Sequence, residues 1–458
     1  MNNTLTTRPR LAFYGDDFDV SIDALDTLHR ANIKSVLFLS PPNPDQQAQF
    51  SGFSAFGVAG QSRSMTPAEM EQYLPPVFQL LKNPGAPIVH YVTSPSFESA
   101  PHVGSIAKVL EIARSQSRCP TIPILAGTPA HGTYCAFGNL FAVEPMSRNP
   151  VRIDHHPSLS SHPVTPMTEA DLKIHLSQQS PHRIELFDLL ALDSEDPDNQ
   201  LRSLLAHSPD GILFDILGPR HLPILGSLIE EMVERGWPLF AIGSTSIEAA
   251  LTSAWGCSAA PAATSPLTGA EQILVIHDGR SKQAQRQHYA AVRSGFLDIP
   301  VETDQLARSE TPESALNQAV ESAIQALDEG KSAILRTVDS NDSQQHSDDT
   351  TFRTLGFSTL NIQLKRHRTI GPKLGGIVNR ILQAHPLKRI VVAGSEASAD
   401  VCRALQTSAI EIKSTSPFTP PICVLHTPSS TDQMEVCFDF EESKSPDLWR
   451  VLRDGRSS

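Results

Sequence analysis

The sequence predicts an α/β protein of two domains, each a mainly parallel sheet flanked by helices, with a cleft between the domains. Short apolar segments alternate with amphipathic segments along the whole chain, a pattern typical of parallel sheets with crossover helices. The length of 458 residues exceeds that of one typical domain. Residues 256–266 are rich in small residues and proline and separate two alternating series, which indicates a linker.

We therefore expect an N-terminal domain over residues 1–255, a linker over 256–270 and a C-terminal domain over 271–458. The strands expected in the N-terminal domain are 11–14, 35–39, 56–58, 88–91, 122–125, 211–215 and 239–242, and two of its helices are 67–81 and 103–114. In the C-terminal domain, strands are expected at 273–276, 332–335, 389–392 and 435–438, and helices at 281–292 and 374–382. The polar segment 336–354 is expected to be a mobile loop.

Composition excludes several classes of function. The net charge is -13, from 37 basic and 50 acidic residues, so a nucleic-acid partner is not expected. A local pocket of arginine or histidine can still bind a small anion. No apolar segment has the length of a signal peptide or a membrane span. The six cysteines show no C-x-x-C spacing, which argues against a zinc site and a disulfide framework and favours a cytoplasmic protein.

Two adjacent carboxylates follow the first expected strand. Gly15 allows a sharp turn after residues 11–14, and Asp16 and Asp17 then precede an amphipathic helix. The carboxyl ends of parallel strands are where open α/β sheets bind small ligands. Repulsion between the two acids would be offset by a cation, a hydroxyl substrate or a role as proton acceptor. Because aspartate is also a favoured helix cap, a purely structural role stays open.

Three more residues of the first half suit a polar ligand. Ser94 and Ser96 lie in a hydroxyl-rich loop after the strand at 88–91 and could bind a polyhydroxylated molecule, although such a loop can equally be a simple turn. Arg63 follows the strand at 56–58 and could hold a carboxylate through two parallel hydrogen bonds. As an isolated surface arginine it would have no such meaning.

A third cluster contains His155, His162 and Thr165. Paired histidines beside an acid suggest a metal site, but the segment has no helical i, i+4 histidine pair and no nearby thiolate. We therefore expect no metal ligands here. Binding of an anion or a hydroxyl by these imidazoles fits the segment better.

In the second half, two turns suit a phosphate. Residues 391–398 read as a strand that enters a small-residue turn before a helix, and this geometry offers backbone N–H groups to a phosphate. The candidate nucleotide-binding residues there are Gly394, Ser395, Glu396 and Ser398. A similar turn after the strand at 273–276 contributes Ser281. Neither turn matches the P-loop or dinucleotide motifs.

Four segments together resemble the four-carbon acid-sugar kinase family, nearest the branch that includes 3-oxo-isoapionate kinase. They are Tyr-Gly-Asp-Asp-Phe at 14–18, Gly-Gln-Ser-Arg-Ser-Met-Thr at 60–66, Phe-Gly-Asn-Leu-Phe at 137–141 and Ser-His-Pro-Val-Thr-Pro-Met at 161–167. The resemblance implies that the N-terminal domain binds a sugar acid and the C-terminal domain binds ATP with Mg²⁺. It also implies that Asp16 or Asp17 is the base beside the substrate hydroxyl. It leaves a homodimer open as the assembly.

The chain departs from the family pattern at both half-sites. Asp19 and Val20 follow the acid pair where the family has threonine and glycine, and Val92 stands where the family has a lysine. The turn at 394–399 keeps one glycine, and three acids occur within 439–446 in place of a lysine and glycines. A second hypothesis is therefore a weakly active or inactive relative that binds a metabolite or regulates a partner. A hydrolase or isomerase that uses the acid pair alone is a third.

Overall fold

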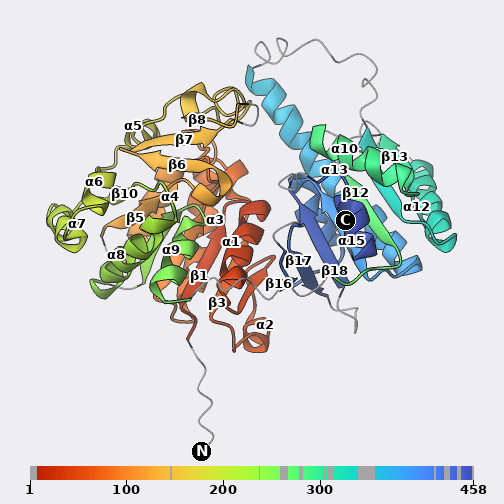
Figure 1. Cartoon of the computed structure of the whole chain (residues 1–458), viewed down its shortest axis with the longest axis horizontal. Coiled ribbons are helices and arrows are strands. Elements are labelled where there is room, and N and C mark those ends of the chain that lie inside the picture. The colour runs from red at the N-terminus through yellow and green to blue at the C-terminus, as the bar shows by residue number, and fades with distance from the viewer. Residues whose placement is uncertain are drawn as a thin grey trace, which may run out of the picture. The chain divides into compact units, whose positions relative to one another are not determined.

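The computed structural model contains two compact units, Met1–Pro261 and Ala262–Ser458, which we call the N-terminal and C-terminal units (Figure 1). The structure describes residues 8–118, 120–144, 147–236, 238–257, 267–277, 282–302, 306, 313–338, 356–416, 419–427, 434–440 and 445–455. Each unit is an α/β structure, as the sequence predicts. Most of the expected linker, the loop from residue 339 onward and Ser281 lie outside the described residues.

The N-terminal unit is built on a parallel sheet of strand order β2-β3-β1-β4-β11-β5-β10-β9. Its strands are β1 Leu11–Gly15, β2 Ser35–Phe38, β3 Ala55–Ala59, β4 Ile88–Val92, β5 Ile122–Leu125, β9 Ile184–Phe187, β10 Gly211–Phe214 and β11 Leu239–Gly243. Every residue of β1 is buried. The chain leaves β1 for β2 on one side and crosses to β4 on the other, so the strand order reverses between β1 and β4. Such a reversal is where open α/β sheets bind ligands.

Helices cover both faces of this sheet. They are α1 Phe18–Arg30, α2 Pro44–Gln49, α3 Pro67–Lys82, α4 Ile106–Gln116, α5 Leu172–Ser177, α6 Leu189–Leu192, α7 Pro197–Leu205, α8 Leu222–Glu234 and α9 Ser246–Ala254. On one face α1 and α8 pack against α9, and on the other α3 packs against α4 (Figure 1). The helix predicted from residue 103 begins at Ile106 instead, because the Ser105 side chain accepts a hydrogen bond from the N–H of Lys108 and caps it.

Strand β11 is the last strand of the unit in sequence, yet it lies between β4 and β5. The buried side chain of His90, on β4, links β4 to β11 and to α9. Its Nδ1 lies 2.6 Å from Glu248 Oε1 of α9, and its Nε2 lies 3.1 Å from the Gly243 carbonyl of β11. Each ring nitrogen of His90 therefore has an oxygen partner, one on α9 and one on β11. Gly243 is required here, because a Cβ at this position would lie 2.1 Å from the Leu125 carbonyl oxygen.

A small antiparallel sheet, which the sequence did not predict, projects from the unit. It consists of β6 Thr133–Ala136, β7 Asn139–Val143 and β8 Pro150–Arg152. The turn between β6 and β7 has positive φ at Phe137 and Gly138. The carboxylate of Asp215, at the end of β10, accepts both turn N–H groups, at 2.6 Å from Phe137 and 2.9 Å from Gly138. This clamp holds a backbone conformation that phenylalanine rarely adopts.

In the C-terminal unit the strand order is β13-β14-β12-β15-β18-β17-β16. The strands are β12 Ile273–His277, β13 Leu297–Glu302, β14 Ala333–Val338, β15 Arg389–Ala393, β16 Ala409–Ser414, β17 Ile422–His426 and β18 Met434–Asp439. The five neighbouring strands β13-β14-β12-β15-β18 pair in parallel. Strand β17 pairs antiparallel with both β18 and β16. The expected loop at 336–354 is wrong for its first residues, because β14 continues through Val338 and pairs Arg336 with Pro300 of β13.

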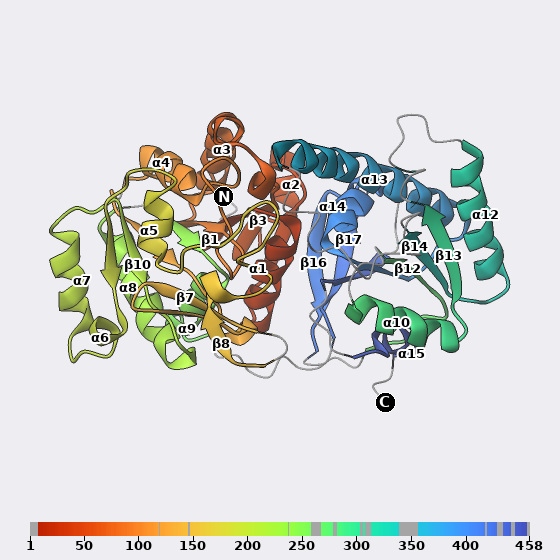
Figure 2. The same cartoon turned by 90° about the horizontal axis from the view of Figure 1, so that it is seen from above.

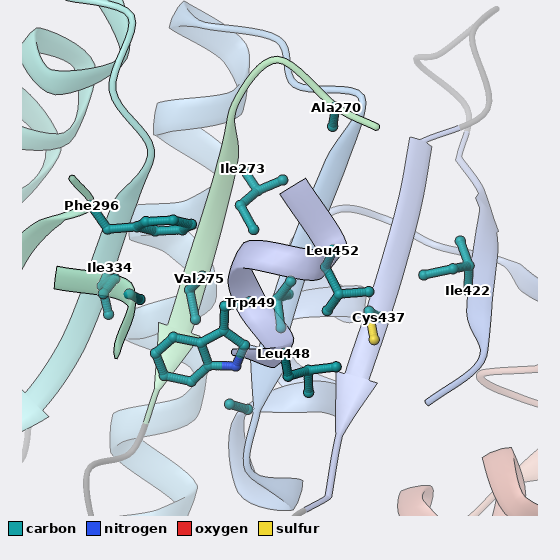
Figure 3. Packing of buried hydrophobic residues seen from close by; sticks show 13 residues of the cluster. Ala270, Ile273, Val275, Phe296, Ile334, Ile422, Cys437, Leu448, Trp449 and Leu452 are labelled. Atoms are coloured by element: carbon teal, nitrogen blue, oxygen red, sulfur yellow. The ribbon is translucent and has the colours of Figure 1, made fainter. Parts of the chain in front are cut away.

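The helices of this unit are α10 Lys282–Arg293, α12 Glu313–Asp328, α13 Gly356–Ala384, α14 Ser395–Ala404 and α15 Leu448–Asp454. Figure 2 shows α13 and α14 on one face of the sheet and α10 and α15 on the other. Trp449 and Leu452 of α15 pack on Ile273 and Val275 of β12 (Figure 3). Within the described residues, no helix is long and apolar enough to cross a membrane.

One buried arginine joins the end of α15 to the centre of the C-terminal sheet. Arg389 of β15 is 1% exposed, and its Nε donates to Glu435 Oε2 of β18 at 2.9 Å. Its other nitrogens donate to the carbonyls of Thr268 and Leu452. Lys413 Nζ of β16 binds the second oxygen of Glu435 at 2.8 Å. Each buried charge therefore has polar partners on several elements.

We expect Arg389→Ala to destabilise the protein by about 3–5 kcal/mol, because it leaves the Glu435 carboxylate buried beside one remaining cation. The measurement is the urea midpoint of unfolding followed by tryptophan fluorescence, to which Trp449 of α15 contributes. The control is Arg403→Ala, since Arg403 pairs with Asp400 at an exposed site and should contribute less than about 1 kcal/mol. Equal midpoints for the two variants would contradict this account of Arg389.

Candidate functional site

Polar side chains gather at the carboxyl ends of β1, β3 and β4. Asp16 follows β1, and its N–H donates to the Val92 carbonyl at the end of β4 at 2.9 Å. Arg63 lies in the short 3₁₀ helix η1, Ser62–Ser64, that follows β3, and its N–H donates to the Asp16 carbonyl at 3.0 Å. These backbone bonds fix the two side chains beside the reversal of strand order. The sequence placed both residues at strand ends, and the fold brings them together.

Arg63 is the centre of this cluster. Its guanidinium lies 2.8 Å from Asp16, 3.4 Å from Asp17 and 3.6 Å from Asp19. The Asp16 side chain is 5% exposed, against 38% for Asp17. The Nε atom of Arg63 is buried without a hydrogen-bond partner among the described residues. One cation therefore holds three carboxylates and keeps one donor unused.

Asp16 and Asp17 bind protons more readily than a free aspartate. Burial raises the pKa of Asp16 to about 6, although the charge of Arg63 opposes this rise. The pKa of Asp17 is also raised, first by burial and next by the charge of Asp19. An acid whose pKa approaches the working pH is suited to accept a proton during a reaction.

Asp17 combines two roles that the sequence left as alternatives. Its Oδ1 accepts from the N–H of Phe18 at 2.7 Å and caps α1. Its Oδ2 lies 3.4 Å from Arg63 and belongs to the more exposed side chain of the acid pair. The structural role as a cap is therefore real, and it leaves the second oxygen at the site.

The loop after β4 adds hydroxyls and one more acid. Ser94 Oγ lies 2.5 Å from Ser96 Oγ, and Glu98 Oε2 accepts from both, at 3.2 Å and 2.7 Å. The charge of Glu98 also contributes to the raised pKa of Asp16, so this loop adjoins the cluster. Ser99 Oγ anchors the loop on α5, 2.8 Å from His175 Nε2.

Sequence reasoning did not single out Asp19 and Glu98 as site residues. Asp19 could have been predicted as a site residue, because it lies two positions after Asp17 in the first turn of α1. Glu98 occurs within the hydroxyl-rich loop, where only the serines drew attention. A carboxylate that accepts from two hydroxyls of its own loop cannot be distinguished from a solvated acid by spacing alone.

The histidine segment forms a separate loop in the described contacts. His155 is exposed at the end of η3, Ile153–His155. Thr165 is buried, and both its N–H and its hydroxyl lie 3.0 Å from His162 Nδ1. Within the described residues, no hydrogen bond or ion pair links these three side chains to Arg63 or its acids. Their role in substrate binding stays a prediction.

In the C-terminal unit, the strand order reverses between β12 and β15, and Gly394 follows β15 at this point. Gly394 has φ +117 and is the N-cap residue of α14, and no described side chain caps this helix. A helix N-terminus at the end of a parallel strand is suited to bind phosphate. Ser398 is fully buried, and its hydroxyl donates to the Gly394 carbonyl at 2.9 Å, which supports the turn. The structure does not describe the side chains of Ser395 and Glu396.

No group of three or more histidine, cysteine, aspartate or glutamate side chains in the described part of the chain could hold a metal ion.

Comparison with known proteins identifies both units. The family profile described as a sugar-binding N-terminal domain matches residues 11–251, and that described as a nucleotide-binding C-terminal domain matches residues 274–438. A 3-oxo-isoapionate kinase of Paraburkholderia graminis is 33% identical over 97% of this chain and 94% of its own length. A 3-oxo-tetronate kinase of Pseudomonas savastanoi pv. phaseolicola is 24% identical over 52% of each chain.

Two solved structures share the fold. A Salmonella typhimurium LT2 protein described as a tRNA synthase has a TM-score of 0.72 and 19% identity, over 95% of this chain and 97% of that one. A Haemophilus influenzae protein has a TM-score of 0.70 and 16% identity, over 96% and 99%. At such identities the likeness concerns the fold alone. The two profiles and the kinase that is similar over its whole length show that the chain belongs to the four-carbon acid-sugar kinase family, as a kinase with a sugar-binding and a nucleotide-binding domain.

Proposed function

We propose that the protein transfers the γ-phosphoryl group of ATP to a hydroxyl of a small sugar acid or oxo-sugar. The observation that carries this proposal is the cluster of Asp16, Asp17 and Asp19 around Arg63 at the reversal of strand order in the sugar-binding domain. Because a relative at 33% identity is a 3-oxo-isoapionate kinase, 3-oxo-isoapionate is the first substrate to test. 3-Oxo-tetronate is the second.

Asp17 is the base in this proposal. Its side chain is far more exposed than that of Asp16, so a substrate hydroxyl can reach its Oδ2. The raised pKa makes this carboxylate a better proton acceptor than an ordinary aspartate. The hydrogen bond from Phe18 holds the other oxygen, which fixes the orientation of the carboxylate.

Arg63 positions the acids, and its positive charge offsets the repulsion between them. A guanidinium that contacts three carboxylates compensates charges that would otherwise raise the energy of the site. Asp16 is the buried member of the cluster and orients Arg63 through the 2.8 Å contact. Its role in the proposal is to position Arg63 rather than to accept the proton.

The charge of the cluster also suggests how the substrate is oriented. Three aspartates and the nearby Glu98 outnumber the single cation Arg63, so the surroundings are negative. A substrate carboxylate would be repelled there, whereas hydroxyl groups can donate to the carboxylates. We therefore place the reacting hydroxyl at Asp17 and the acid group of the substrate away from it. His155, His162 and Thr165 are candidates for binding that acid group, and Ser94 and Ser96 for binding other hydroxyls.

The nucleotide in this proposal binds at the start of α14. Backbone N–H groups after Gly394 would hold phosphate oxygens, and Ser395, Glu396, Ser398 and Ser281 complete the candidate set. ATP supplies the phosphoryl group, and Mg²⁺ bound to its phosphates would neutralise the charge that develops during transfer. The protein contributes mainly by positioning the hydroxyl and by removing its proton.

One observation favours the second candidate function, a weakly active or inactive relative that binds a metabolite. Val92, where the family has a lysine, is fully buried at the end of β4, next to Asp16. A cation that would balance a substrate acid or a phosphate is therefore missing at that position. Binding of a sugar acid without turnover would support this alternative over the kinase.

Mg·ATP should stabilise the full-length protein. At 100 times Kd the expected gain is about 2.7 kcal/mol, which raises the thermal midpoint. The measurement is differential scanning fluorimetry with Mg·ATP, followed by ADP release with 3-oxo-isoapionate and 3-oxo-tetronate. No shift at millimolar Mg·ATP would exclude the kinase. A shift without ADP release on any tested sugar acid would favour the binding protein.

Asp17→Asn should lower kcat by about 10²–10⁴, the usual contribution of a general base. Asparagine caps helices as well as aspartate does, so the thermal midpoint should change little. The assay is ADP release at saturating substrate, with the fold checked by circular dichroism. Unchanged turnover would remove Asp17 from the mechanism.

The dependence of kcat/KM on pH should report a base with a raised pKa. Because the base must be unprotonated, activity is present above its pKa and is lost as the pH falls through it. This loss should occur well above the ordinary aspartate value of 3.8. Asp19→Asn should move the acid limb to lower pH, because the charge of Asp19 raises the pKa of Asp17. An acid limb that does not move in this variant would exclude Asp17 as the titrating group.

A further inference from the structure

Two adjoining hollows lie in the N-terminal unit, outside the site described above. The first has a volume of about 340 Å³ and is mainly apolar; we call it the aromatic hollow. Four phenylalanines line it: Phe38, Phe50, Phe53 and Phe56. The second has a volume of about 520 Å³ and a polar lining that includes Arg8, Lys82 and Arg118, which we call the basic rim. Arg8 and Pro84 line both hollows, so the two lie next to each other.

The aromatic hollow has a clear origin in the fold. Val36 and Phe38 project from the same face of β2, and Phe56 is the register partner of Val36 on β3. The helix that should cover this face is α2, which has only six residues and none of them buried. Phe50 and Phe53, just after α2, form part of the wall, and their rings meet edge-on with centroids 5.2 Å apart. An apolar space therefore remains beneath a helix too short to fill it.

The basic rim has three cations that lack an acidic partner in the described part of the chain. Among the described residues, no aspartate or glutamate lines the second hollow. Within the described residues, no ion pair involves Arg8, Lys82 or Arg118. Lys82 donates to the carbonyl of Gln116 at 3.4 Å, and burial alone lowers the pKa of its amine. A bound anion would supply the negative charge that these three side chains lack.

The basic rim lies at the opposite end of the strands from Asp16, and the aromatic hollow extends from it along β2 and β3. Arg8 precedes β1 and Pro84 precedes β4, whereas Asp16 and Ser94 follow the same strands. A strand of five residues spans about 17 Å at 3.3 Å per residue. A carboxylate bound at the basic rim would therefore not touch the acids around Arg63, none of which lines either hollow.

We propose that the aromatic hollow and the basic rim together form a second binding site, for a carboxylate that carries an acyl chain of medium length. The apolar chain fills the space among the four phenylalanines, and the carboxylate binds the cations of the rim. The volume of the hollow lies at the lower end of the range for small-molecule sites, which favours a single chain. Charge complementarity selects an anion over a neutral alkane or alcohol.

The test uses the full-length protein and isothermal titration calorimetry. Butanoate, hexanoate and octanoate probe the hollow, and affinity should rise about fourfold for each added methylene. Acetate tests charge without a chain, and 1-octanol tests the chain without charge. The site requires that octanoate bind at least about tenfold more tightly than either control. Equal affinity for 1-octanol, or no binding of octanoate, would overturn the proposal.

Two matched pairs of variants locate the binding. Ala48→Trp places a large side chain at the lining of the hollow, and Gln49→Trp places the same side chain one position along the exposed helix α2. Only the first should abolish octanoate binding. The double change of Arg8 and Arg118 to Gln should weaken octanoate by about tenfold or more, and Arg202→Gln, far from the rim, should not. Octanoate binding that both Ala48→Trp and the double change leave intact would place the ligand elsewhere and overturn the proposal.

Discussion

The candidate site of the N-terminal unit depends on one guanidinium. Arg63 reaches the acids of the β1 turn and is itself held by a backbone bond to Asp16. Without this cation, the three carboxylates that share it would either take up protons or separate. The same contact decides which acid can react, because it sequesters Asp16 and leaves Asp17 more exposed. The chemistry and the local structure therefore rest on a single ion-pair network.

The C-terminal unit uses a buried arginine for a different purpose. Arg389 binds Glu435 and two carbonyls, and it has no opening toward a ligand. Its partners come from a neighbouring strand and from the segments at both ends of the unit, so its role is to join elements. The contrast with Arg63 lies in the donors left unused: Arg63 keeps a buried Nε–H, whereas both terminal nitrogens and the Nε of Arg389 are bonded.

Much of the fold could be predicted because its signal is local. Buried strands such as 122–125 are short apolar segments, and the structure has β5 at these residues. The small sheet of β6, β7 and β8 could not be found in this way, because its turn depends on the carboxylate of Asp215, which lies 77 residues from Gly138 in sequence. The antiparallel pairing of β17 could not be predicted either, because the sequence of a strand does not show whether it runs parallel or antiparallel to its neighbours.

The candidate site also combines features with a local sequence signal and features that depend on residues distant in sequence. The sequence identified Asp16, Asp17 and Arg63 separately, from strand ends and residue type. It could not show that they meet, because a separation of 47 positions in sequence says nothing about the distance between Asp16 and Arg63 in space. Glu98 was missed because only its hydrogen bonds from Ser94 and Ser96 mark it as part of the site, and the sequence does not show these bonds. His155, His162 and Thr165 show the reverse case, in which a distinctive sequence forms a loop with its own internal contacts.

The place of β11 has a consequence for how the protein is made. This strand is the last of its unit to leave the ribosome, yet it lies between β4 and β5. Without Leu239–Gly243 the strand order β2-β3-β1-β4 cannot connect to β5-β10-β9, and β4 and β5 would each lack their inner partner. Strands without a partner are sites where chains aggregate. The continuous sheet of the N-terminal unit therefore requires the last strand in its sequence, which pairs with β4 and β5 and precedes the helix whose Glu248 contacts His90.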